Sequence, residues 1–156
     1  MSASNDASES QNQRYWFYIL AQASPAARYS HAVKLADKAY QQGDRACIVC
    51  DTMQQAQELD DLLWNFRPDA FVPHSVVPDS ASTTSDPVAI LLCTPSADDW
   101  DTVILLSDTL PADADRFRRL ALIAHSDEEI LNQARSHFRQ LKALGITPQV
   151  HDQRKR

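Results

Sequence analysis

The chain has 156 residues, of which 44% are hydrophobic and 23% charged, the composition of a soluble globular protein with one domain and a sizeable core. The formal net charge of −6 argues against broad contact with nucleic-acid phosphates, although a local basic patch is compatible with it. No apolar run is long enough to span a membrane and the N-terminus lacks a secretory signal, so we expect a cytoplasmic protein without a membrane partner.

A βαβ unit opens the folded part of the chain, after a polar stretch at residues 1–13 that predicts a disordered tail. Residues 15–20 are apolar on both faces, so we expect a strand that is central in a sheet. Ser24, followed by a proline, predicts the start of a helix, and Gly43 predicts its end. Residues 46–50 then predict a buried strand, parallel to the first and connected to it by a right-handed crossover.

A second helix follows this strand at once. Asp51 or Thr52 supplies its N-terminal cap, and an apolar stripe runs along it from Met53 to Phe66. Pro68 ends the helix, because the residue before a proline avoids the α region. A short extended segment comes next, with the sequence Phe71-Val72-Pro73-His74.

The second half of the chain alternates strands with polar connections. We predict a polar surface loop at residues 75–86 and a final helix that begins at a Ser126 cap and ends at Gly145. The other expected elements are strands at residues 87–93, 102–106 and 120–124, an acidic turn at 95–101, a short helical or irregular connection at 111–117 and an edge strand at 146–150. This order predicts a single three-layer α/β domain at residues 14–150, with a mostly parallel sheet, helices on both faces and a basic tip at 151–156.

Sheets of this kind often bind nucleotides at the carboxyl ends of their strands, so a small nucleotide-dependent α/β enzyme is the first alternative. The turn after Leu20 reads Ala-Gln-Ala-Ser-Pro-Ala-Ala and lacks the glycines of a phosphate-binding loop. Cys47 and Cys50 lie three positions apart in a strand and point to opposite faces, which indicates buried core thiols rather than a redox or zinc pair. The five histidines show no metal-binding spacing. We therefore expect no cofactor, no metal and no catalytic residue.

Four titratable residues near the second helix deserve a separate interpretation. Glu58, Asp60 and Asp61 lie mostly on its polar face, and we interpret them as solvated rather than as acid–base groups. His74 ends the extended segment, where it either orients a loop or lies in a cleft.

Two groups of residues indicate binding surfaces. Trp64 and Phe71 flank the end of the second helix, where each is either a core residue or an exposed interface anchor. On the final helix, three cations spaced by four and three positions share one face, beside two apolar residues; the cations are Arg135, Arg139 and Lys142, and the apolar residues are Leu131 and Phe138. That face is either merely solvated or binds an anion, and a short acidic peptide suits it better than DNA.

Taken in order, several stretches resemble the chi subunit family of bacterial DNA polymerase III, an accessory protein of the clamp-loader assembly. The resemblance covers residues 14–150 and is most specific at Phe71-Val72-Pro73-His74. The other stretches that carry it are Phe17-Tyr18-Ile19-Leu20, residues 38–45 and 56–64, Pro87-Val88, and the helix that contains Ala134-Arg135 and ends at Gly145.

The resemblance implies a nucleotide-binding-like fold without nucleotide chemistry, in a non-catalytic bridging protein. One face would bind the psi subunit, which connects to the clamp loader, through Trp64 and Phe71, and in some relatives that surface serves a repair helicase. A different face would bind the acidic C-terminal peptide of single-stranded-DNA-binding protein, mainly through Arg135, with a further basic position at Arg139. DNA itself would be reached only indirectly.

Three features depart from the family pattern. The N-terminal tail is longer, and residues 75–86 contain no glycine where relatives often have a glycine-rich stretch. Leu131 stands where a basic residue can occur, which bears on how strongly the chain grips the acidic peptide.

Overall fold

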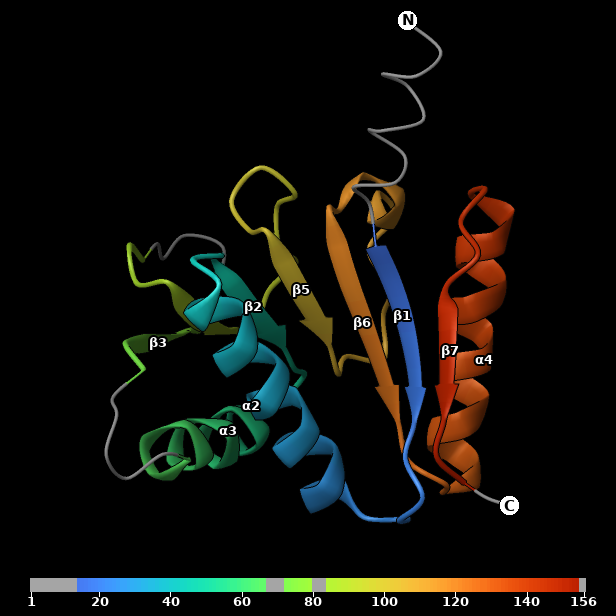
Figure 1. Cartoon of the computed structure of the whole chain (residues 1–156), viewed down its shortest axis with the longest axis horizontal. Coiled ribbons are helices and arrows are strands. Elements are labelled where there is room, and N and C mark those ends of the chain that lie inside the picture. Colours follow the sequence, from blue (N-terminus) through green and yellow to red (C-terminus); the bar gives the residue numbers. More distant parts are fainter. Residues whose placement is uncertain (1–13, 67–71, 80–83, 155–156) are drawn as a thin grey trace, which may run out of the picture.

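The computed structural model describes residues 14–66, 72–79 and 84–154, so the expectations for residues 1–13, Pro68 and Phe71 lie outside the described residues. Within these ranges the strands form one seven-stranded sheet in the order β3-β4-β2-β5-β6-β1-β7, and every pair of neighbours is parallel (Figure 1). The strands are β1 (Arg14–Ile19), β2 (Ala46–Val49), β3 (His74–Val77), β4 (Val88–Leu91), β5 (Thr102–Leu105), β6 (Arg119–Ala124) and β7 (Gln149–Asp152). The helices are α2 (Pro25–Gln41), α3 (Met53–Asn65), the short 3-10 helix η1 (Ala114–Arg116) and α4 (Glu128–Ala143).

The helices cover both faces of the sheet, which confirms the predicted three-layer α/β fold (Figure 1). Alternation along the strands divides the buried apolar residues into two clusters. Helices α2 and α3 pack on the face that carries Ile48, Ile90 and Ile104, whereas α4 packs on the face that carries Phe17 and Leu122. Exposed side chains on α3 and exposed side chains on α4 therefore lie on opposite sides of the sheet.

Local side-chain chemistry explains most of the helix ends. The Ser24 hydroxyl accepts a hydrogen bond from the Ala27 N–H at 3.4 Å, as predicted. Thr52, rather than Asp51, caps α3 and forms a capping box with Gln55. Gly43 and Gly145 follow α2 and α4 with φ angles of 85° and 89°, a left-handed conformation that favours glycine.

The predicted Ser126 cap of the final helix is wrong. Asp127 caps α4 instead, because its carboxylate accepts a hydrogen bond from the Glu129 N–H at 3.2 Å. The Ser126 hydroxyl donates to the Ala21 carbonyl oxygen at 3.4 Å and so contacts the turn that follows β1. Serine and aspartate are both good N-terminal caps, but the Ser126 hydroxyl is engaged elsewhere and Asp127 caps the helix.

The predicted loop at residues 75–86 begins too early, since His74–Val77 forms β3. The segment is only four residues long and contains just two consecutive apolar residues, which is a weak strand pattern. Hydrogen bonding to a neighbouring strand stabilises it instead. β3 lies parallel to β4, with His74 opposite Val88 and Val77 opposite Leu91. β3 is consequently one edge of the sheet among the described strands.

The expected central position of β1 is also wrong, because β1 lies between β6 and the edge strand β7. Its residues Trp16 and Tyr18 are only half-buried as a result. The predicted parallel orientation of β1 and β2 in one sheet is correct, but β5 and β6 separate them. The predicted edge strand after α4 is present as β7 and extends to Asp152.

Candidate functional site

Trp64 is an exposed aromatic residue near the C-terminal end of α3. Its side chain is 57% exposed, so the interpretation of Trp64 as a core residue is wrong. The neighbouring α3 residues Ala56, Leu59 and Leu63 are buried and face the sheet, as the apolar periodicity predicts. The position of Phe71, the other predicted aromatic anchor, lies outside the described residues.

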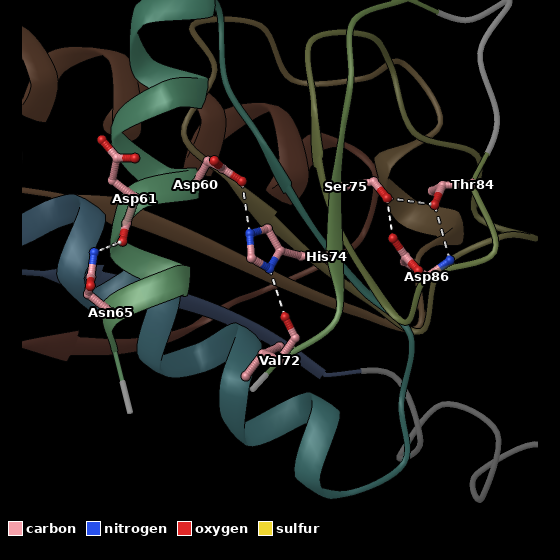
Figure 2. Close-up of polar contacts among 8 residues, drawn as sticks. All are labelled: Asp60, Asp61, Asn65, Val72, His74, Ser75, Thr84 and Asp86. Atoms are coloured by element: carbon pink, nitrogen blue, oxygen red, sulfur yellow. Dashed lines mark hydrogen bonds and ion pairs between the residues drawn. The ribbon is translucent and has the colours of Figure 1, made fainter. Parts of the chain in front are cut away.

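Beneath Trp64, a buried histidine joins α3 to the edge strand β3. The His74 side chain is 1% exposed, and its two ring nitrogens contact the Asp60 carboxylate at 2.8 Å and the Val72 carbonyl oxygen at 2.7 Å (Figure 2). The Trp64 and His74 rings meet edge-to-face, with centroids 5.3 Å apart. We call the exposed Trp64, together with the supporting residues Asp60, Val72 and His74, the Trp64 surface.

These contacts show which of the predicted roles His74 and the α3 carboxylates have. His74 orients the segment that leads into β3, whereas Glu58 and Asp61 are exposed on α3, as predicted. Asp60 does not fit the prediction of a freely solvated carboxylate, because it is half-buried and bonded to His74. One sequence feature is consistent with the contacts among Asp60, Trp64 and His74. Asp60 and Trp64 are four positions apart and so lie on one side of the helix.

A second polar cluster fixes β3 from the direction of β4. The Ser75 hydroxyl donates to the Asp86 carboxylate, and the Thr84 hydroxyl donates to the Ser75 oxygen at 3.1 Å (Figure 2). The Asp86 N–H in turn donates to the Thr84 hydroxyl oxygen at 3.1 Å. Both His74 and its neighbour Ser75 are thus tied to other parts of the fold, which restricts the movement of this edge strand.

The predicted basic face is present on α4. Arg135, Arg139 and Lys142 are all exposed, and we call them the α4 basic stripe. The Arg135 guanidinium donates to the Asn132 side-chain oxygen at 3.3 Å, within the same helix. An arginine that makes so few contacts is available to an incoming anion.

The two apolar residues beside the stripe differ in their accessibility. Leu131 is 7% exposed and belongs to the core under α4, so it offers little surface to a ligand. Phe138 is half-buried and packs against Phe17 with a centroid distance of 5.5 Å. An apolar contact next to Arg135 would therefore fall mainly to Phe138.

The carboxyl edge of the sheet, where a nucleotide would be expected, is occupied by internal hydrogen bonds. Arg28, from the first turns of α2, donates to the carbonyl oxygens of Ile123 at 2.7 Å and Leu106 at 3.1 Å. The Asp51 carboxylate accepts from the Ser107 hydroxyl at 2.7 Å and from the Asp108 N–H at 2.9 Å. Arg28 and Asp51 are thus engaged in internal hydrogen bonds at this edge.

The remaining chemical candidates are structural. Cys47 and Cys50 are 0% and 2% exposed, which confirms the prediction of buried core thiols. In the described parts of the chain, no group of three or more histidine, cysteine or acidic residues is arranged to hold a metal ion. Among those same residues, no helix has both the length and the apolar character needed to cross a bilayer.

These observations define a class of protein: a three-layer parallel α/β domain without a glycine-rich phosphate loop, with an exposed aromatic residue on one face and a basic helix on the other. Residues 13–149 match the family described as DNA polymerase III chi subunit, HolC. The DNA polymerase III subunit chi of Pseudomonas aeruginosa is 36% identical over 135 residues, which cover 86% of this chain and 93% of the relative. The subunit chi of Haemophilus influenzae is 28% identical over 138 residues, covering 83% of this chain and 90% of the relative. The chain belongs to the DNA polymerase III chi subunit family, as the resemblance indicated.

Proposed function

We propose that this protein is a non-catalytic accessory subunit of the DNA polymerase III holoenzyme in the cytoplasm. In this proposal it bridges the psi subunit of the clamp loader to the acidic C-terminal tail of single-stranded-DNA-binding protein during replication. The observation that carries the proposal is the separation of two chemically different surfaces, with Trp64 on α3 and the α4 basic stripe on opposite faces of one sheet.

The Trp64 surface suits an apolar protein partner. Trp64 is 57% exposed, so a partner that covers it would remove a large apolar area from water. Tryptophan is also among the residues most enriched at the energetic centres of interfaces, where truncation to alanine typically costs about 2 kcal/mol or more. We therefore assign the psi subunit to this face, with Phe71 as the second proposed contact. A repair helicase is the proposed competitor for the same surface.

The α4 basic stripe suits a short acidic peptide. Its three cations point from one helical face, so they attract successive carboxylates along an extended chain. A guanidinium donates two parallel hydrogen bonds to a carboxylate, so we assign the peptide's terminal carboxylate to Arg135. Arg139 and Lys142 then attract the upstream aspartates, and Phe138 contacts the peptide's terminal phenylalanine. Exposed charge contacts of this kind predict an affinity of about 1 μM that falls with added salt.

The alternative, a small nucleotide-dependent enzyme, predicts a different result. The turn after β1 contains no glycine, and Arg28 and Asp51 at the carboxyl edge are already engaged in internal hydrogen bonds, which argues against a phosphate site formed by these groups. We expect no heat of binding when adenine or guanine nucleotides are titrated into the protein. A saturable nucleotide complex would favour the enzyme over the bridge.

Two single substitutions, each assayed against both partners, test the proposal. Trp64→Ala is expected to weaken binding of purified psi in calorimetric titration while leaving the affinity for an acidic peptide ending in phenylalanine unchanged. Arg135→Ala is expected to do the reverse. The proposal fails if neither variant changes its assigned partner's affinity, or if each variant weakens both partners without a loss of folded protein.

A further inference from the structure

We propose that His74 and Asp60 are positioning residues that hold the Trp64 indole in its outward, partner-ready orientation. The inference deepens the proposed function: it relies on that function for the identity of the partner, but the orientation of the indole is a property of this chain alone. The carrying observation is the chain of contacts from the Asp60 carboxylate through the His74 ring to the Trp64 ring (Figure 2 shows its first half).

The His74 ring is fixed at both nitrogens. Val72 offers a carbonyl oxygen and Asp60 a carboxylate oxygen, and both groups only accept hydrogen bonds. Nδ1 lies 2.7 Å from the Val72 oxygen and Nε2 lies 2.8 Å from the Asp60 carboxylate, so the ring is held between two acceptors at hydrogen-bond distance. With its side chain 1% exposed, the imidazole is shielded from water that could compete for these two hydrogen bonds.

The Trp64 indole contacts this ring directly. Its own side chain is mostly in solvent, and an edge-to-face contact at 5.3 Å is a preferred geometry for two aromatic rings. A side chain that is already oriented loses less rotamer freedom on binding, so a preorganised indole binds its partner more tightly than a freely rotating one.

The surroundings of His74 are suited to this role. Val72 is 1% exposed, and Ser75 is tied to Asp86, which lies just before β4, so the strand that carries the histidine is anchored on both sides of it. Asp60 projects from the same side of α3 as Trp64, one helical turn earlier. The carboxylate, the imidazole and the indole thus form one support between α3 and β3.

Asp60→Ala is the informative variant, because it removes the fixed acceptor without emptying the buried site of His74. Asp60→Asn is the conservative partner, since a carboxamide of the same shape retains a hydrogen bond to the ring. Asp61→Ala is the matched control: it removes the same charged group from an adjacent, exposed position of α3. The melting temperature of each variant verifies that the protein is folded.

The first readout needs no partner. In protein labelled with fluorotryptophan, the fluorine spectrum contains one resonance for each of the three tryptophans, and Trp64→Phe identifies the resonance of Trp64. Asp60→Ala is expected to shift and broaden the Trp64 resonance while leaving those of Trp16 and Trp100 in place, and Asp61→Ala is expected to change none. An unchanged Trp64 resonance in Asp60→Ala would overturn the proposal.

The second readout is a double-mutant cycle with psi. Asp60→Ala is expected to weaken psi binding by about three- to tenfold when Trp64 is present, with Asp60→Asn restoring most of the affinity. In the Trp64→Ala background, Asp60→Ala should cause no further loss, because its effect passes through the indole. Equal losses in both backgrounds would show that Asp60 acts independently of Trp64, and the positioning role would be rejected. If Trp64→Ala itself leaves psi binding intact, the proposed psi contact fails, and the fluorine spectrum still decides whether Asp60 and His74 orient the indole.

Discussion

Arg28 donates a 2.7 Å hydrogen bond to the main-chain carbonyl oxygen of Ile123, a residue 95 positions further along the chain. The same guanidinium reaches the Leu106 carbonyl oxygen at 3.1 Å, so one α2 side chain joins the carboxyl ends of β5 and β6. Burial lowers the pKa of the Arg28 guanidinium. A cation from the protein itself therefore lies at the edge where other α/β sheets bind their ligands.

Substitution of Arg28 should destabilise the fold. Arg28→Met keeps much of the aliphatic volume but leaves two carbonyl oxygens without their charged donor. We expect the free energy of unfolding to fall by about 2–4 kcal/mol. Urea denaturation measures it, with Lys34→Met as the control because Lys34 is exposed on the same helix. An effect no larger than that of the control would mean that water replaces Arg28 at no cost.

The three cysteines should differ in reactivity. Burial raises the pKa of all three thiols, that of Cys50 to about 12 and that of Cys47 well above its ordinary value, but only Cys93 is half-buried and so within reach of a reagent. We expect Ellman's reagent at pH 8 to label one thiol in the native protein and all three after unfolding. Cys93→Ser should abolish native-state labelling. Rapid labelling of that variant would contradict the burial of the other two thiols.

The raised pKa of Cys50 also predicts the direction of a pH effect. The folded protein keeps the thiol proton up to about pH 12, whereas the unfolded chain releases it near its ordinary value of 9.0. The contribution of this group to stability is therefore complete below pH 9 and declines as the pH rises from there. Urea denaturation of the wild type and Cys50→Ala between pH 8 and 10 measures it, and parallel curves for the two proteins would contradict it.

Binding of the acidic peptide should depend on one carboxylate and on salt. Since Arg135 is exposed, we expect Arg135→Ala to cost at most about 1 kcal/mol, or about fivefold in affinity. Amidation of the peptide's C-terminus should cause a similar loss in the wild type and little further loss in the variant. Fluorescence anisotropy at several salt concentrations measures both effects. Lys38→Ala is the control, because Lys38 is an exposed cation on α2, across the sheet. Salt-independent binding would contradict a charge-based contact.

Local chemistry allowed much of the fold to be predicted from the sequence. The Thr52 cap and the glycines after α2 and α4 act within a few residues of their own position, so a short stretch of sequence contains the necessary information. The strand β3 cannot be recognised from its own four residues, because its stability comes from pairing with β4. The predicted Ser126 cap is wrong for a related reason, since the serine hydroxyl contacts the distant residue Ala21.

The candidate site likewise combines features that follow from local sequence with features that depend on tertiary contacts. Helical spacing was sufficient to place Arg135, Arg139 and Lys142 on one exposed face. It was not sufficient for Asp60 and His74, which lie 14 positions apart and meet only because β3 returns alongside α3. The exposure of Trp64 also depends on how β3 packs against α3. Its position on the helix lies next to the apolar stripe, so helical spacing alone is compatible with a buried or an exposed side chain.

The central claim is that the protein holds two partners at once. The most direct measurement is the affinity of a labelled acidic peptide for this protein, alone and in complex with saturating psi. We expect dissociation constants that agree within about twofold, as for independent sites, together with a higher anisotropy plateau for the larger complex. Displacement of the peptide by psi would show that the partners share one surface, and the bridge would be contradicted.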